Sequence, residues 1–249
     1  KSGVMSQRPF RTPHHSASLP GLVGGGSFAN PGEISLSHLG ILFLDEMTEF
    51  SRTHLDSLRQ PMETGTITIS RAQHCFTYPA DFLLVGACNP CPCGYRGDPV
   101  KHCVCSPSQA DRYWTRISGP IMDRIDLHVE IGRLHESDLT QLRSGESSEM
   151  IRLRVMRAVE RQKNRFPEDT FRFNGQLNQM DIRRFCRIDS KSRDLLVAAV
   201  ARLGLSARAY DRVLRISRTI ADLDDVDDIS IDHVAEAVHF RHLRFSSVA

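Results

Sequence analysis

The amino-acid sequence predicts an α/β protein in two parts, a parallel sheet with helices followed by an all-helical part. Two apolar runs, residues 41–44 (ILFL) and 82–89 (FLLVGACN), lack polar alternation until they end. Such strands are typical of parallel sheets, which are covered on both faces. From about residue 139 the apolar spacing changes to the helical period. We therefore expect two domains, residues 1–138 and residues 139–249.

In the first part, residues 1–38 are rich in Pro, Gly, Ser and His. This composition predicts loops with one short helix near residues 35–39. Apolar residues near helical spacing predict a helix over 51–62. The stretch 65–82 (GTITISRAQHCFTYPADF) predicts a strand, a turn and a second strand ahead of the strand at 82–89.

The second part is expected to be helical throughout. An apolar stripe over residues 195–203 ends at Gly204, and glycine suits the position just after a helix. Ser206 is expected to cap the next helix, because its hydroxyl can accept a bond from a free backbone N–H. Ser230 is expected to cap a last helix near residues 232–243.

The composition is that of an ordinary soluble globular protein, with 40% apolar and 25% charged residues. The apolar runs are shorter than the roughly 18 residues of a membrane span. The first residues lack the apolar core of a signal peptide. We expect no membrane association and a cytoplasmic location.

Basic residues are unevenly spread along the chain, although the net charge is only +2. Residues 139–219 carry 18 basic and 9 acidic side chains, whereas residues 1–138 carry 12 basic and 14 acidic. The excess of arginine can face an anionic partner such as nucleic acid. Solvated charges on helix surfaces explain the same count equally well.

Polar groups follow the two apolar strands directly. Asp45 and Glu46 end the first strand, and Asn89 ends the second. The carboxyl edge of an open α/β sheet is where ligands bind. In a nucleotide hydrolase the first acid can hold Mg²⁺, the second can activate water, and a neutral polar group can orient that water. The alternative is an exposed acidic turn after a core strand.

Several motifs in order resemble one family. GILFLDE looks like a Walker B motif, and FLLVGACNP resembles the sensor 1 strand of AAA+ ATPases. The stretch 66–78 resembles the β-hairpin that precedes sensor 1 in the branch holding Mg-chelatases. RPFRTPHH, NPCPCGYRGDP, SGPIMDRIDLHV and LSARAYDRVLRISRTIADL are together similar to Mg-chelatase-like AAA+ proteins of the ComM/YifB group. The resemblance implies an AAA+ P-loop NTPase core followed by a helical lid.

The resemblance also implies roles for particular residues. Asp45 is expected to bind Mg²⁺, Glu46 to activate water, and Asn89 to act as sensor 1. Arg124 is expected to be the arginine finger that reaches a neighbouring subunit's nucleotide, with Arg116 as the reserve candidate. Arg208 is expected to be sensor 2 on the lid. Without the resemblance, a surface salt bridge explains each of these arginines.

One expected motif is missing. No GxxxxGK[ST] loop occurs, and Gly24, Gly25 and Gly26 are followed by Ser27 and Phe28. This loop supplies the N–H groups and the lysine that hold phosphates. In the family it precedes the RPFR segment, so we expect the chain to begin after it. The whole protein is then expected to be an ATPase, and this chain alone to be inactive.

Five of the seven cysteines lie between residues 88 and 105. Cys91 and Cys93 form one close pair, and Cys103 and Cys105 form another. Four thiolates in two pairs suit tetrahedral Zn²⁺ in a structural site without an open position. Cys88 and His102 are possible substitutes as ligands. The alternatives are reduced thiols without metal, or a disulfide formed on oxidation.

Two aromatic features leave alternatives open. His14 and His15 suggest a metal site, but a loop at a pore or subunit interface is the preferred interpretation. The single Trp114 can stack on a nucleic-acid base or pack against its own domain.

The resemblance implies ATP and Mg²⁺ as cofactors and self-association into a ring, with a hexamer expected. It further implies DNA translocation such as branch migration, with Arg71 and His74 of the 66–78 hairpin touching phosphates in the pore. One rival function is a chelatase-type motor that remodels a protein partner. A second is a non-enzymatic, zinc-stabilised DNA-binding module.

Overall fold

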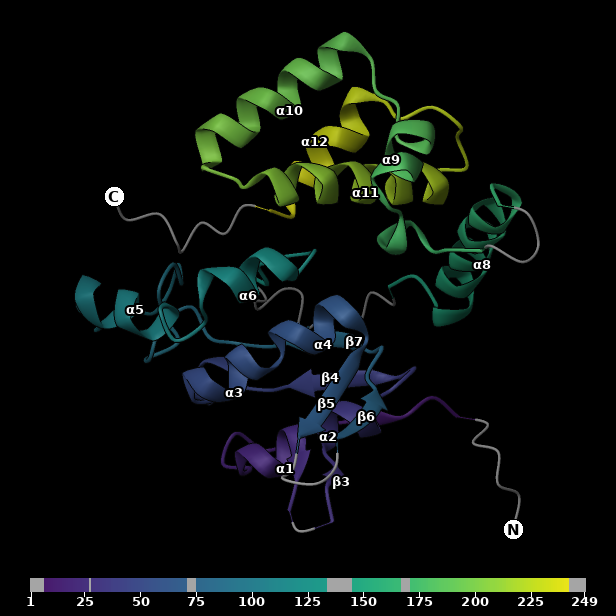
Figure 1. Ribbon diagram of the computed structural model, residues 1–249. Helices are drawn as coiled ribbons and strands as arrows, with labels where there is room; N and C mark the ends of the chain where they lie inside the picture. The colour runs from purple at the N-terminus through teal and green to yellow at the C-terminus, as the bar shows by residue number, and fades with distance from the viewer. Residues whose placement is uncertain (1–6, 27, 71–74, 134–144, 167–170, 242–249) are drawn as a thin grey trace. The chain divides into compact units, whose positions relative to one another are not determined.

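The computed structural model describes residues 7–26, 28–70, 75–133, 145–166 and 171–241 (Figure 1). The chain divides into two compact units, which meet in sequence between Ile125 and Asp126. The strands of the first unit are β1 (Phe10–Arg11), β2 (Gly24–Gly25), β3 (Asn30–Pro31), β4 (Ile41–Leu44), β5 (Thr66–Ser70), β6 (Cys75–Pro79) and β7 (Leu83–Gly86). Its helices are α1 (Leu19–Val23), α2 (Glu33–Leu36), the 3-10 turn η1 (Met47–Glu49), α3 (Arg52–Ser57), α4 (Arg59–Thr64), α5 (Pro107–Trp114) and α6 (Gly119–Arg124).

The main sheet of the first unit is parallel, in the order β1-β4-β7. Strand β4 pairs with β7 over four residues, from Ile41 beside Leu83 to Leu44 beside Gly86. The entrance to β4 depends on Gly40, since a Cβ at this position would lie 2.0 Å from the carbonyl oxygen of Pro9. That close approach lets Ile41 N–H donate to the Pro9 carbonyl at 2.8 Å and seats β1 against β4.

The expected coverage of both strand faces is wrong for β7 in the structure. Leu83 is 60% exposed and Val85 is 38% exposed, and Phe10 on β1 is 59% exposed. On β4, by contrast, Leu42 and Leu44 are fully buried. The described residues of this unit cover one face of the sheet, so the alternate apolar side chains of β1 and β7 face outward.

The predicted strand–turn–strand forms the antiparallel hairpin β5–β6. The predicted single helix over 51–62 is instead two short helices, α3 and α4, which meet at Leu58. Pro61 explains the break because it has no N–H to donate to the preceding turn. The expected helix at 35–39 lies earlier, as α2, and α1 was not predicted.

One apolar core holds the first unit together. It combines side chains from the short helices, from β4 and β5, and from the segment that leads into α6: Leu22, Ile34, Leu42, Leu44, Met47, Phe50, Leu55, Leu58, Ile67, Ala80, Ile117 and Ile121. Trp114 packs against this core and is half-buried. The expectation that Trp114 packs against its own domain is confirmed.

Every secondary-structure element that the structure describes in the second unit is a helix or a helical turn. Its elements are α8 (Ser148–Asn164), the 3-10 turn η3 (Asn174–Gln176), α9 (Gln179–Phe185), α10 (Ser190–Leu203), α11 (Ala207–Leu223) and α12 (Ile231–His239). The predicted caps are confirmed. Gly204 ends α10 with a left-handed φ of 60°, and the hydroxyls of Ser206 and Ser230 accept backbone N–H groups of α11 and α12.

A buried ionic network crosses the helices of the second unit. The carboxylate of Asp222, 1% exposed, accepts bonds from Arg165 at 2.6 Å, Asn174 at 2.8 Å and Arg218 at 3.2 Å. A buried charge is tolerated only when partners satisfy it in this way. Part of the arginine excess of residues 139–219 is therefore structural.

The segment 126–133 belongs with the second unit. His128 N–H donates to the carbonyl of Phe240 at 2.8 Å, and Arg212 pairs with the carboxylate of Asp126. The expected domain boundary at residues 138 and 139 falls in 134–144, which lie outside the described residues, so it stays a prediction of the sequence. Within the described part of the chain, we find no helix with the length and apolar character needed to cross a membrane.

Candidate functional site

The carboxyl ends of β4 and β7 form one continuous edge. Beyond the last paired residues, Ala87 N–H donates to the Leu44 carbonyl at 2.9 Å, and Met47 N–H donates to the Ala87 carbonyl at 2.8 Å. These bonds bracket Asp45 and Glu46, whose side chains are exposed at this edge. Adjacent paired strands lie about 4.8 Å apart. The two acids and the end of β7 are therefore neighbours.

The two acids are fixed by local backbone geometry. Glu46 has a left-handed φ of 49°, which is unfavourable for a residue with a Cβ by about 1–2 kcal/mol. Its backbone N–H donates to Oδ1 of Asp45 at 2.9 Å. Both side chains are exposed to solvent at this turn. Strain of this kind is concentrated at functional sites.

Asn89 is exposed and lies three residues beyond Gly86, the last residue of β7, so it does not end the strand as expected. Its neighbourhood is held by α5. Trp114 Nε1 donates to the Pro90 carbonyl at 2.9 Å. Burial raises the pKa of the Tyr113 hydroxyl, and that hydroxyl contacts the Thr48 side chain and the Asn89 backbone. The sequence did not predict these two supports, because they arise from the tertiary contact between α5 and the strand end.

His15 is a further residue at this edge that the sequence analysis did not assign there. Its Nδ1 lies 3.4 Å from Oε2 of Glu46, and its ring packs edge-on against Phe50 with centroids 6.4 Å apart. The ring of His14 lies against that of His15, with centroids 4.1 Å apart. The HH dipeptide was visible in the sequence, but nothing local linked it to a strand end 30 residues later.

The two candidate finger arginines make contacts within the first unit. Arg124, at the end of α6, has a side chain only 9% exposed, which pairs with Glu63 of α4 and donates to the Pro120 carbonyl at 2.6 Å. Arg116 donates to the Thr48 carbonyl and to Glu49 Oε2, each at 2.9 Å. Arg116 thus ties the end of α5 to the turn that follows Glu46.

The other basic candidates lie elsewhere. Arg208 is exposed in the first turn of α11, in the second unit. Arg71 and His74 fall between β5 and β6 and lie outside the described residues.

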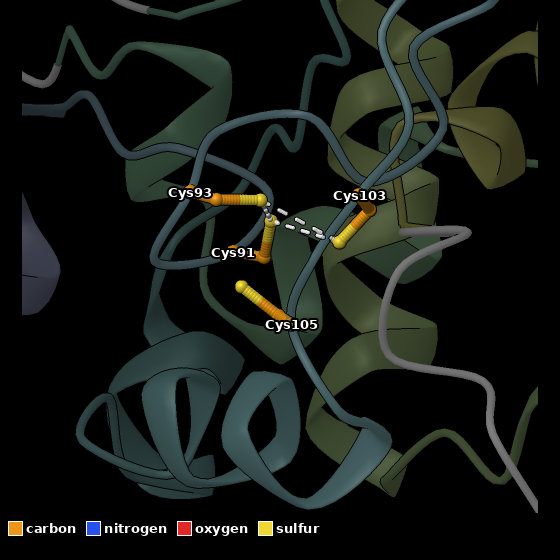
Figure 2. A group of neighbouring side chains, drawn as sticks. All are labelled: Cys91, Cys93, Cys103 and Cys105. Atoms are coloured by element: carbon orange, nitrogen blue, oxygen red, sulfur yellow. Dashed lines mark hydrogen bonds between the residues drawn. The ribbon is translucent and has the colours of Figure 1, made fainter.

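Four thiols meet in the loop between β7 and α5. The Sγ of Cys91 lies 3.4 Å from that of Cys93 and 3.6 Å from that of Cys103, and the Cys93 and Cys103 sulfurs are 3.6 Å apart. Cys105 joins them, with all four sulfurs within 4.8 Å of one another. Figure 2 shows the four side chains pointing toward a common centre. We refer to these residues as the four-cysteine cluster.

The donor set of the four-cysteine cluster suits a metal ion. Among the described residues it is the one group of this kind, and neither Cys88 nor His102 is part of it. The backbone N–H of Tyr95 lowers the pKa of Cys93 to about 6, and burial raises the pKa of Cys105 to about 12. Thiolates are the form in which cysteine binds metals.

The strand edge also has donors that suit the implied cofactor. Carboxylate and amide oxygens, as at Asp45 and Asn89, are the ligands that Mg²⁺ prefers. The lysine-bearing loop that would hold a nucleotide's phosphates does not occur in the 249 residues. The donor types at Asp45 and Asn89 therefore suit Mg²⁺.

A parallel sheet with two acids after one of its strands, followed by a helical unit, is consistent with an AAA+ core and its helical lid. Comparison with known families agrees. Residues 1–139 match the family model described as magnesium chelatase, subunit ChlI, and residues 145–241 match that for the C-terminal part of this subunit. The chain belongs to the magnesium chelatase ChlI family.

The similar proteins confirm the resemblance to the ComM/YifB group. The chain is 48% identical over 237 residues to YifB of Escherichia coli (strain K12), a match covering 94% of this chain and 46% of YifB. It is equally identical over 237 residues to the competence protein ComM of Haemophilus influenzae, with 94% and 45% covered. Rv2897c of Mycobacterium tuberculosis is 41% identical over 239 residues, with 96% and 47% covered. The chain thus spans about half the length of these relatives.

Proposed function

We propose that this chain supplies the hydrolytic strand edge and the helical lid of a Mg²⁺-dependent AAA+ ATPase. The observation that carries the proposal is the common edge of β4 and β7, where Asp45, Glu46 and the end of β7 are neighbours. The left-handed backbone at Glu46, φ 49°, is a strained conformation of the kind found at functional sites. Membership in the magnesium chelatase ChlI family supports the same activity for the whole protein.

Each residue at the edge has a distinct task in this proposal. Mg²⁺, when bound, neutralises charge on the phosphate oxygens. Asp45 holds the ion or its water, and Glu46 accepts the proton of the attacking water. The amide of Asn89 fixes the direction of that water. His15, beside Glu46, limits the positions that the Glu46 carboxylate can take.

The arginines act on the charge that develops at the phosphate. In this proposal Arg208 does so from the lid of the same chain, and Arg124 does so in a neighbouring subunit of a ring, for which we propose a hexamer. Arg124 would first have to exchange its ion pair with Glu63 for that phosphate. Arg116, bound to Thr48 and Glu49, is better suited to supporting the turn after Glu46.

For the substrate of the motor we propose DNA, translocated through the ring in the cytoplasm, as in branch migration. Support comes from the name of one relative, a competence protein. Further support is the basic excess of residues 139–219, where 18 basic side chains stand against 9 acidic. Arg71 and His74 stay the candidates for contacts with DNA phosphates in the pore. The alternative, favoured by the description of the family model, is a chelatase-type motor that remodels a protein.

ATP hydrolysis by the whole protein, measured with and without branched duplex DNA, tests the proposal. We expect Mg²⁺-dependent hydrolysis that DNA stimulates, and weaker stimulation when Arg71 and His74 are both replaced by alanine. An ATP hydrolysis rate that is the same with and without DNA would favour the protein-remodelling motor. DNA binding without any hydrolysis would favour a non-enzymatic DNA-binding module and would overturn the proposal.

A further inference from the structure

The sulfur atoms of the four-cysteine cluster are spaced as metal ligands are. A Zn–S bond of about 2.3 Å in a tetrahedron puts neighbouring sulfurs about 3.8 Å apart. The separations of 3.4 and 3.6 Å are close to this value. A disulfide would require about 2.05 Å. The spacing is therefore that of four ligands around one ion and not that of two disulfides.

The loop that carries the cluster is folded for a tight return. Gly94 and Gly97 have φ values of 80° and 82°, a left-handed conformation that glycine adopts without strain. Gly94 N–H donates to the Cys91 carbonyl at 2.9 Å. The carboxylate of Asp98 accepts the N–H groups of Val100 at 2.8 Å and Lys101 at 2.7 Å. These bonds bring the second cysteine pair back to the first.

The surroundings favour a charged metal–thiolate group. Four thiolates around a divalent ion carry a net charge of −2, and the thiol protons pass to solvent when the ion binds. Arg112 lines the same groove as Cys93 and Cys105, so a positive side chain is close to that charge. Cys91 is fully buried, as a structural ligand without an open position should be.

The cluster is connected at both ends to the hydrolytic edge. Cys91 lies two residues after Asn89, separated from it by Pro90. At the other end, Cys105 is followed by Ser106, which caps α5 with a capping box. Helix α5 carries Trp114 back to the Pro90 carbonyl. The loop 91–105 and α5 therefore form a ring of contacts that closes at Pro90, the residue after Asn89.

We propose that the four-cysteine cluster binds one Zn²⁺ and that the closed loop 91–105 positions Asn89 at the strand edge. We infer the metal site from the sulfur geometry alone, independently of the proposed function. The role at Asn89 rests on the proposed function, in which this residue orients the attacking water. Loss of the ion releases the loop, and with it the bond between Trp114 and the Pro90 carbonyl.

The test uses the 249-residue chain and needs no nucleotide. Metal analysis is expected to find one zinc per chain, and Cys103→Ser is expected to lose it. Cobalt in place of zinc should give the absorption bands of tetrahedral Co²⁺ with four thiolates. Trp114 is the only tryptophan, so its fluorescence reports on the loop directly. Chelation of the zinc should shift this emission to longer wavelength and increase its quenching by iodide.

Two variants serve as controls. Cys75→Ser removes an exposed thiol outside the cluster, and Cys88→Ser removes the neighbour that the sequence left open as a ligand. Both should keep the zinc. Chelation of the unsubstituted chain stands in for Cys103→Ser if that variant does not fold.

A folded chain without zinc, whose cluster thiols alkylate freely or form disulfides, would overturn the metal site. Zinc loss that leaves the Trp114 emission unchanged would overturn the positioning role. Both readouts are independent of ATP hydrolysis, so failure of the proposed function would leave them as predicted.

Discussion

Glu46 combines a strained backbone with a neighbouring histidine side chain. Its backbone has a left-handed φ of 49°, and Nδ1 of His15 lies 3.4 Å from its Oε2 atom. The sequence indicated Glu46 as a candidate site residue because it directly follows an apolar strand, and this is a local signal. It did not predict His15, since that contact depends on the path of the N-terminal loop. The same limit applies to Trp114, whose partner is 24 residues away.

Cys186 provides a prediction about pH. Burial raises the pKa of this thiol to about 11. A thiol with an ordinary pKa of about 8.5 is ionised far more at pH 8, so alkylation of folded Cys186 should be about 10²-fold slower than in the unfolded chain. Mass spectrometry after iodoacetamide treatment measures this, with exposed Cys75 as the control for reagent access.

The same shift has a consequence for stability. A raised thiol pKa means that the folded state holds the neutral form while the unfolded state ionises first. The neutral Cys186 thiol therefore contributes its full share to the free energy of unfolding below the ordinary thiol pKa. This share is lost as the pH rises toward about 11. Urea unfolding of the unsubstituted chain should show a fall in stability across this range that is smaller in Cys186→Ala. An equal fall in both would contradict the assignment.

At the scale of elements, local rules worked where a helix end is decided by one residue. Gly204, Ser206 and Ser230 act as predicted because capping needs only the helix's own backbone. The single helix over 51–62 was wrong because apolar spacing outweighed Pro61 in the prediction. The outward-facing side chains of β7 were missed because an apolar run shows that a strand can be buried, not what covers it.

A substitution at Gly40 tests whether the pairing of β1 with β4 requires a residue without a side chain at this position. An added Cβ would meet the backbone of Pro9, which cannot move without breaking the pairing of β1 with β4. We expect Gly40→Ala to lower the free energy of unfolding of the first unit by about 1–3 kcal/mol. Gly119→Ala is the matched control, because an added Cβ there meets no atom within 4 Å. Equal stability of the two variants in urea would refute the close-approach argument.

For the whole molecule, several motifs in order indicated the class of protein, which no single motif could indicate. A strand ending in Asp-Glu is common, but several sequence motifs in order resembled those of AAA+ ATPases, and the fold and the family models bear out this resemblance. The chain spans about half of its curated relatives, so the activity belongs to the whole protein in this account. The sequence could not indicate that the cysteines and the strand edge are linked through α5, since that link is tertiary.

We infer that Glu46 activates water at the edge shared by β4 and β7. Replacement of Glu46 by glutamine in the whole protein removes a base but keeps the side chain's shape. We expect ATP turnover to fall about 10²- to 10⁴-fold while Mg²⁺–ATP binding is retained. Glu236→Gln, which removes an exposed charge on α12, should leave turnover unchanged. Turnover by Glu46→Gln equal to that of the unsubstituted protein would contradict the account.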